Sequence, residues 1–471
     1  MDIFVILLSL AFLMLVAYRG FSVILFAPVA AMLAVAFTNP NLVPVFFSGI
    51  FMEKLAGFVK LYFPVFLLGA IFGKLIEISG FARSIAYFIV RLIGEKRAML
   101  TIVLICALLT YGGVSLFVVA FAIYPFAVEL FRLADIPKRL IPATIALGAF
   151  TFTMDALPGT PQIQNIIPTT FFNTTTWAAP WLGLIGSVLV FTCGMFYLEW
   201  RRKAAMKKRQ GYASGIHSGD KPGRLIQAGS GEGILAPVAV AFLPLLLVGV
   251  CNKVFTLVIL NLSERRFDFA AIGLADIPPL EVPKLAAVWA VSGALIVGIA
   301  AVIFSSFKTI QKSFRKGTQE SIGGAMLATL NTASEYGYGS VIAALPGFKQ
   351  INKGLAHAIS DPLINEAVTT TTLAGVTGSA SGGMSIALAA MSDTYIEQAA
   401  RHGIPNEVLH RVASMASGGM DTLPHNGAVI TLLAITGLTH RESYIDIFAM
   451  TIIKTVVVFL IIGLYYLTGI V

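Results

Sequence analysis

The sequence has 471 residues, of which 57% are hydrophobic and 12% are charged, and its mean hydropathy is +0.84. A soluble domain of this composition would aggregate, so we expect a multi-spanning membrane protein in a lipid bilayer. The net charge is +9, but Lys and Arg fall in short clusters between apolar spans, as the positive-inside rule requires, so no nucleic-acid partner is expected.

The first segment, residues 1–54, is predicted to be a scaffold helix pair. Apolar runs at 3–18 and 21–37 are separated only by Arg19-Gly20, and turn residues at 39–41 end the pair. Neither a basic region nor a cleavage site marks the first run as a signal peptide, so we expect a retained span.

A third span is predicted from about 55 to 78. The basic residues after it place that end in the cytoplasm and the N-terminus outside.

The next apolar run, 98–110, is too short for a span, which needs about 20 residues. It ends in Tyr-Gly-Gly-Val-Ser at 111–115, and the run 116–133 then leads to a second basic cluster. Both arms therefore open on the cytoplasmic side. This pattern predicts a re-entrant hairpin within a first repeat, residues 55–200.

A broken helix should follow this hairpin. We expect a half-helix at 142–154, a break at 155–161 and a second half at 162–172, because Asp and Pro interrupt the apolar span. Residues 177–200 then return the chain inward.

The hydrophilic stretch 201–233 is predicted to be a flexible cytoplasmic linker. Residues 234–317 should form a helix pair between the repeats, joined by an outside loop. The last segment, residues 318–471, therefore starts on the opposite side from the first repeat and ends outside. Both termini are expected outside a bacterial inner membrane, in a multi-pass topology.

The sequence contains an internal repeat. Met-Asp-x-Leu-Pro occurs at 154–158 and at 420–424, and other landmarks of the first repeat recur in the same order in the second. The second hairpin is predicted at 363–397, opening outside, with its tip at 377–383. The fold class expected is an all-α integral membrane protein, an inverted-repeat transporter with two re-entrant hairpins and two broken transmembrane helices.

Small and hydroxyl residues at the hairpin tips and helix breaks suit an anionic substrate. Half-helix N-termini offer free N–H groups, and Gly lets the backbone approach a ligand. The alternative is that these residues only pack helices tightly. The residues expected to bind substrate are Gly112, Gly113, Ser115 and Thr160, together with Thr377, Gly378, Ser379, Ser381, Gly382, Gly383, Thr422 and Asn426.

Four ionisable residues are candidates to carry a coupling proton: Asp155, Asp421, His425 and Glu335. Acids at mid-membrane depth are costly and indicate function, and imidazole titrates near neutral pH. For the two aspartates the alternatives are cation ligation or capping of the following half-helix, and for His425 a structural hydrogen bond. Other acids and histidines, Glu129, Glu366, Glu397, His357, His402, His410 and His440, are expected to be solvated or structural.

The three cysteines, Cys106, Cys193 and Cys251, are isolated in apolar segments. Neither a disulfide framework nor a metal site is expected, and no cofactor either.

Three stretches resemble the gluconate permease family of proton-coupled carboxylate symporters, within the larger ion transporter superfamily. They are TGSASGGMSIAL (377–388), SGGMDTLPHNGAVITLLAITGLTH (417–440) and TMDALPGTPQIQNIIPTT (153–170). The sequences of these stretches are most similar to the branch that transports short hydroxy acids such as 3-hydroxybutyrate. The resemblance implies import by proton symport, a homodimer with a scaffold domain, and elevator-type movement.

Other functions are less well matched. The hairpins lack the Ser-Asn-Thr signature of sodium-coupled dicarboxylate relatives, yet a sodium-coupled carboxylate transporter stays the alternative. An intramembrane enzyme would be expected to carry HExxH, GxSxG or a protease aspartate motif, and the sequence has none. A channel is not excluded by broken helices alone.

Overall fold

The computed structural model describes residues 2–471 apart from 20, 95–96, 213–235, 263–265, 275, 312, 349, 351–358 and 425. His425 and most of the predicted linker therefore lie outside the described residues. The described chain is helical except for one short strand pair, which confirms an all-α architecture.

The chain begins with α1 (Asp2–Tyr18) and α2 (Val23–Thr38). It then continues through η1 (Pro40–Leu42), α3 (Val43–Phe46), the π-helix η2 (Phe47–Met52) and α4 (Glu53–Ile78). The predicted span from about 55 to 78 agrees with α4, and the short helices before it continue into α4 without a gap, so that Pro40–Ile78 form one 39-residue apolar helical run. Pro40 and Pro44 stand in first turns, where a missing N–H costs no hydrogen bond.

The first repeat continues with a short helix, a hairpin, a broken helix and a long helix. These are α5 (Phe81–Ile93), α6 (Ala98–Tyr111), α7 (Leu116–Leu133), η4 (Lys138–Leu140), α8 (Ile141–Ala149), α9 (Phe152–Asp155), α10 (Ile163–Phe172) and α11 (Pro180–Lys207). The predicted linker start at 201 is wrong. The basic run continues α11 to Lys207 because Arg201 bonds to the buried Asp446 and Arg202 to Glu199.

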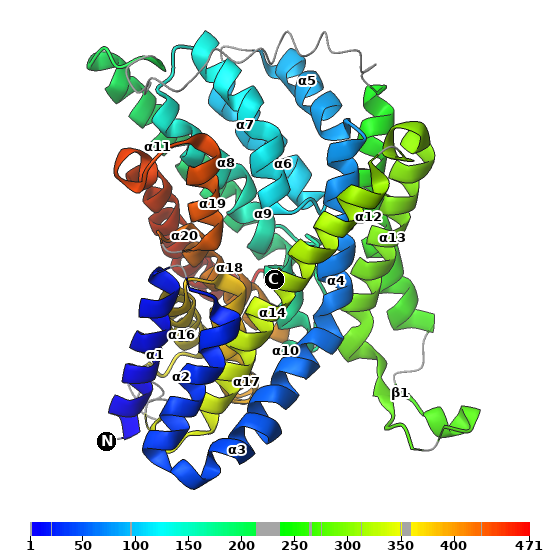
Figure 1. Ribbon diagram of the computed structural model, residues 1–471, viewed down its shortest axis with the longest axis vertical. Coiled ribbons are helices and arrows are strands. Elements are labelled where there is room, and N and C mark those ends of the chain that lie inside the picture. The colour runs from blue at the N-terminus through cyan, green and yellow to red at the C-terminus, as the bar shows by residue number, and fades with distance from the viewer. Residues whose placement is uncertain are drawn as a thin grey trace.

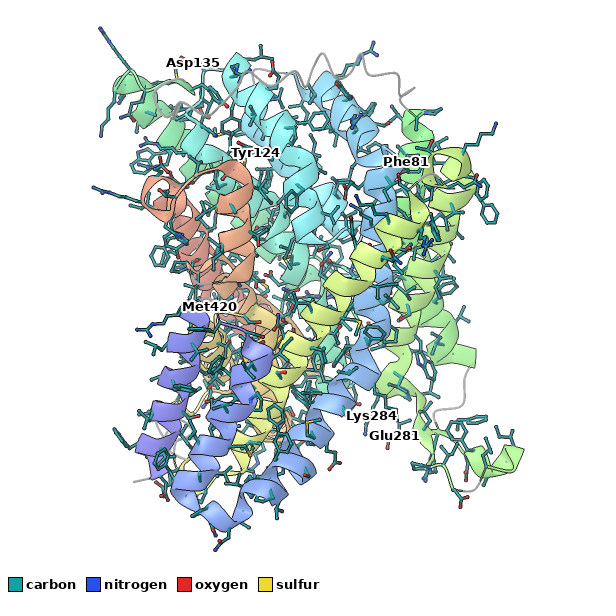
Figure 2. The ribbon with its side chains drawn as sticks, in the orientation of Figure 1. Phe81, Tyr124, Asp135, Glu281, Lys284 and Met420 are labelled. Atoms are coloured by element: carbon teal, nitrogen blue, oxygen red, sulfur yellow. The ribbon has the colours of Figure 1, made fainter. Side chains whose placement is uncertain are left out.

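The helix pair between the repeats consists of α12 (Val238–Leu262) and α13 (Val282–Gln311), which pack on each other. Their connection contains β1 (Arg266–Phe267), η7 (Phe269–Ile272) and β2 (Leu280–Glu281), and the two strands pair antiparallel. This ribbon, not predicted from the sequence, projects from the lower end of the molecule in Figure 1, and Glu281 and Lys284 mark its base in Figure 2.

The first repeat starts with the long helix α4, and the second repeat likewise starts with a long helix. A hairpin, a broken helix and another long helix then follow in both repeats. The elements of the second repeat are α14 (Phe314–Ala344), α16 (Pro362–Thr377), α17 (Ala380–Arg401), α18 (Asn406–Gly418), η8 (Gly419–Thr422), α19 (Gly427–Thr436) and α20 (His440–Thr468). Hairpin α6–α7 lies in the upper half of the molecule and hairpin α16–α17 in the lower half (Figure 1). Met420, at the second helix break, lies between them near mid-height (Figure 2).

Five helical runs of the described chain are long and apolar enough to cross a membrane, among them Pro40–Ile78, Val282–Gln311 and His440–Thr468. Helix α14 runs diagonally across the molecule (Figure 1), with α2 and α4 packed on it as well as α17 of the second hairpin. It therefore connects the N-terminal helices to the tip of that hairpin.

Candidate functional site

The helix break of the first repeat begins at Phe150 and Thr151, where the backbone leaves helical geometry between α8 and α9. This is earlier than the predicted break at 155. The hydroxyl of Thr151 donates to the Leu147 carbonyl at 2.5 Å and that of Thr153 to the Gly148 carbonyl at 2.8 Å. These side chains supply hydrogen bonds that the interrupted helix does not, which is what a break inside a membrane requires.

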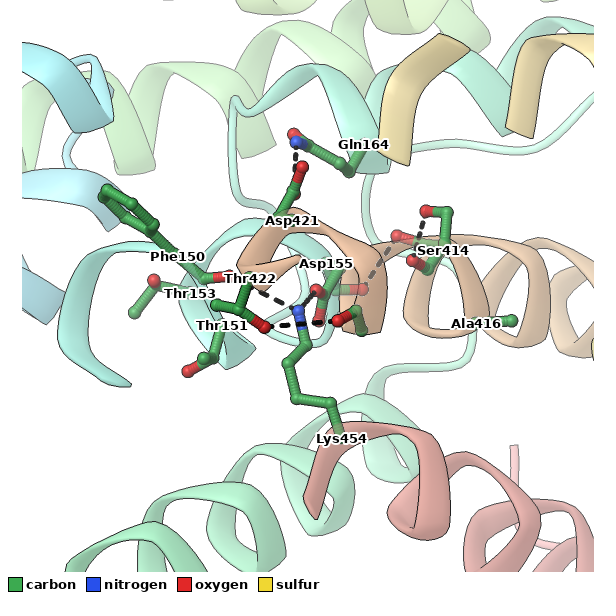
Figure 3. A network of polar contacts seen from close by, with 12 residues as sticks. Phe150, Thr151, Thr153, Asp155, Gln164, Ser414, Ala416, Asp421, Thr422 and Lys454 are labelled. Atoms are coloured by element: carbon green, nitrogen blue, oxygen red, sulfur yellow. Dashed lines mark hydrogen bonds and ion pairs between the residues drawn. The ribbon is translucent and has the colours of Figure 1, made fainter. Parts of the chain in front are cut away.

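Asp155 forms a buried ion pair with Lys454 of α20 (Figure 3). The ammonium also donates to the free Phe150 carbonyl at 3.4 Å, and the Asp155 and Lys454 side chains are only 1% and 3% exposed. The predicted alternative that Asp155 caps the next half-helix is wrong, since α10 begins at Ile163 and no side chain caps it at its N-cap residue, Gln162.

A second buried cation holds the backbone of this break. Arg411 is fully buried and donates to the Asp155 carbonyl at 2.9 Å and to the Ala178 carbonyl at 2.7 Å. Ser414 donates to the same Asp155 carbonyl at 2.8 Å. Sequence reasoning missed both Lys454 and Arg411. For Lys454 the available signal was a single base within an apolar run, which indicates function as a single acid does.

Asp421 lies at the second helix break and accepts hydrogen bonds from two neutral amides. Gln164 of the first repeat donates at 2.9 Å and Asn426 at 3.4 Å. The Asn426 side-chain oxygen caps α19 by accepting from the Ala428 N–H at 2.7 Å. Asn426, rather than Asp421, is therefore the cap, and Gln164, which the sequence analysis missed, connects the two breaks.

The tip of the second hairpin brings predicted substrate and proton residues together. Gly378 has a positive φ of 70° and ends α16, and Ser379 caps α17 by accepting from the Gly382 N–H at 3.1 Å. The buried Glu335 of α14 lies beside the Ser379 hydroxyl, and its Oε2 has no hydrogen-bond partner among the described residues. A Cβ on Gly382 would collide with the Glu335 carboxylate, so this carboxylate lies directly against the helix N-terminus.

The other predicted hydroxyls of this half are already engaged. Thr377 donates to the Leu373 carbonyl at 3.0 Å, and Ser381 lies 3.5 Å from the Thr332 hydroxyl. Thr422 shares a 2.6 Å hydrogen bond with Thr451. Gly383 lies against the Ala374 backbone, so its small size lets α16 and α17 approach each other.

The tip of the first hairpin is packed differently. A Cβ on Gly112 would collide with Leu245, and one on Gly113 would lie 3.2 Å from Leu295. These contacts are apolar, which is what the helix-packing alternative predicts for the two glycines. Ser115 is partly exposed, and Thr160 donates to the Thr153 carbonyl at 2.7 Å.

Two residues expected to be solvated or structural are fully buried. His410 is structural, with hydrogen bonds to Thr174 at 2.6 Å and Asn165 at 3.1 Å. Glu366 of α16 is buried, and neither carboxyl oxygen has a hydrogen-bond partner within the described part of the chain. An unpaired buried carboxyl is stable when it holds a proton.

A surface cavity of about 420 Å³ lies away from this site, with Arg97, Met99, Phe191 and Arg202 in its lining. None of the candidate residues lines it.

The chain is 59% identical over 473 aligned residues to a Bacillus subtilis (strain 168) protein named "Uncharacterized transporter YxjC", and the match covers 100% of both chains. No family model matches the chain. A crystal structure of the YdaH transporter of Alcanivorax borkumensis aligns with a TM-score of 0.46 and 15% identity, over 89% of this chain and 88% of that one.

Proposed function

The chain belongs to the family of the transporter YxjC, and from this premise we propose that it is a secondary active transporter, not an enzyme, that imports a small hydroxycarboxylate with protons. The substrate class is 3-hydroxybutyrate or a gluconate-like sugar acid, as the resemblance to gluconate permeases implies. The membrane proposed is the bacterial inner membrane, with both termini outside.

One observation carries the carboxylate assignment. The Glu335 carboxylate lies against Ser379 and Gly382 at the N-terminus of α17. A helix N-terminus with free N–H groups is a site for anions. The protein's own carboxylate therefore marks a position that a substrate carboxylate would occupy.

The same contact gives a reason for proton coupling. Two carboxylates that meet in a buried site repel each other unless one of them holds a proton. A substrate that binds beside Glu335 or Asp421 would therefore bring a proton with it. A substrate anion that enters together with one proton carries no net charge. Its import therefore avoids the energy of moving a charge against the membrane potential, which is about 2.3 kcal/mol per charge and per 100 mV.

The movement we propose is an elevator in a homodimer. Helix α14, which carries Glu335, packs on α2 and α4, whereas the hairpin tip belongs to the unit formed with α18 and α10. The contact between Glu335 and the tip thus joins two helix groups, one of which would serve as the scaffold and the other as the moving unit.

Uptake by purified protein in proteoliposomes tests the proposal. An inward proton gradient should drive saturable accumulation of a labelled hydroxy acid, with 3-hydroxybutyrate, lactate, gluconate and glycerate compared as competitors. A sodium gradient that drives uptake without a proton gradient would favour the sodium-coupled alternative. Flux that neither saturates nor concentrates substrate would favour a channel.

A further inference from the structure

We propose that the Lys454 ammonium permanently fills a cation seat at the first helix break, in place of a coupling sodium ion, so that transport needs no sodium. This inference rests on the proposed transport function. It extends that proposal by assigning a role to a residue that the sequence analysis did not select.

The seat is built from oxygen atoms of the broken helix. Lys454 Nζ contacts the Asp155 carboxylate and the Phe150 carbonyl, which is free because α8 ends at Ala149 (Figure 3). A Cβ on Gly418 would collide with the Asp155 carboxylate and lie 2.6 Å from Lys454 Nζ. The absence of a side chain at Gly418 therefore leaves room for the pair.

These oxygens are the kind that bind sodium in transporters with discontinuous helices, where unwound carbonyls and a carboxylate coordinate the ion. A lysine ammonium is a compact single positive charge on a flexible stem, so it can satisfy the same oxygens. With the Asp155 charge neutralised, a second cation would meet repulsion there instead of attraction.

The second break differs in this respect. Asp421 is hydrogen-bonded by the neutral amides of Gln164 and Asn426, and no ion pair between described residues involves it, whereas Asp155 is paired with Lys454. The two aspartates occupy matching positions in the repeats, yet within the described part of the chain only Asp155 is directly ion-paired with a lysine. Lys454 thus removes the first position from ion coupling and leaves Asp421 and Glu335 to exchange protons.

Thermal unfolding of the purified protein in detergent tests the seat without any substrate, and so independently of the proposed substrate. Melting temperatures are compared in sodium chloride and choline chloride at equal ionic strength. We expect no sodium-specific shift for the wild type. For Lys454→Ala, which opens the seat but keeps Asp155, the melting temperature should rise with the logarithm of the sodium concentration.

Two control variants make the test decisive. Lys454→Arg keeps a cation and should stay insensitive to sodium, and Asp155→Asn/Lys454→Ala lacks the carboxylate and should also be insensitive. A sodium-specific shift in the wild type would overturn the proposal. So would a folded Lys454→Ala that ignores sodium, or a Lys454→Ala that folds in neither salt while the double variant folds.

Discussion

At the scale of single residues, the pair between Asp155 and Lys454 is the most deeply buried ion pair among the described residues. Asp155→Asn would leave the ammonium buried without its counter-ion, and breaking such a pair costs about 3–5 kcal/mol. We expect the variant to unfold at a clearly lower temperature in detergent.

The matched control is Asp155→Asn/Lys454→Met, which removes both charges. Its free energy of unfolding should recover most of the loss, because no uncompensated buried charge remains when both charges are removed. Equal stability of the single and double variants would show that the pair is not the source of the effect.

Glu335 and Glu366 allow a second matched comparison, because both are buried glutamates and the same change to Gln removes the titratable group. Glu335→Gln should abolish concentrative uptake under a proton gradient, whereas exchange of internal for external substrate should survive. Glu366→Gln should keep concentrative uptake. The Glu366 carboxyl oxygens have no hydrogen-bond partner among the described residues, so a neutral amide can replace the carboxyl without breaking a bond. The reverse pattern would move proton coupling to Glu366.

The acids of this site could be predicted, but their partners could not. Asp155, Asp421 and Glu335 stand out as single acids in apolar runs. Lys454 is 299 positions from Asp155, and Gln164 is 257 positions from Asp421. Only the packing of one repeat on the other brings such residues together, and no local pattern encodes it.

At the scale of elements, neighbouring glycines of the second hairpin should behave differently. An added methyl at Gly382 meets the end of the Glu335 side chain, which can move, whereas one at Gly383 meets the Ala374 backbone, which cannot. Gly382→Ala should fold and lose uptake, and Gly383→Ala should lose folded protein. Size-exclusion profiles and uptake in proteoliposomes distinguish the two results.

The control for this comparison is Gly323→Ala in α14, where nothing lies within 4 Å of the added Cβ. A helix interior gains about 0.5–1 kcal/mol from Gly→Ala, so folding and uptake should be unimpaired. If Gly382→Ala transports as well as Gly323→Ala, the tip is not part of the substrate site.

The hairpins and broken helices were visible in the sequence as short apolar runs ending in Gly, Ser or Pro. Their boundaries were less accessible. The first break starts at Phe150, where Thr151 and Thr153 bond to carbonyls of the preceding turn. Thr329 makes the same kind of bond within the unbroken helix α14, so threonine alone does not mark a break in the sequence. The first-turn role of Pro40 likewise depends on the fold around it, because proline both ends and begins helices.

At the scale of the whole molecule, the orientation in the membrane is a prediction from the basic clusters. In a variant with alanine at the three native cysteines, Ser214→Cys should react with an impermeant thiol reagent only from the inside. Position 214 lies outside the described residues. The control is Ile272→Cys in the loop between α12 and α13, where Ile272 is 61% exposed. This control should react from outside in intact cells, and the opposite pattern would invert the topology.

The internal repeat was evident from the sequence motifs, and the recurring order of helices in the two halves agrees with that repeat. The β1–β2 ribbon was not, since each strand has only two residues. The division of the candidate site between α14 and the second hairpin was also hidden, because it depends on how α14 crosses the molecule.

The pair between Asp155 and Lys454 also bears on how the chain is made. Lys454 is synthesised 299 residues after Asp155, which at about 5–20 residues per second takes roughly 15–60 s on the ribosome. During that time Asp155 lies in an incomplete helix bundle that lacks its counter-ion, Lys454. Nascent chains that stop before α20 would keep this uncompensated carboxyl, a feature by which membrane quality control could distinguish unfinished copies from complete ones.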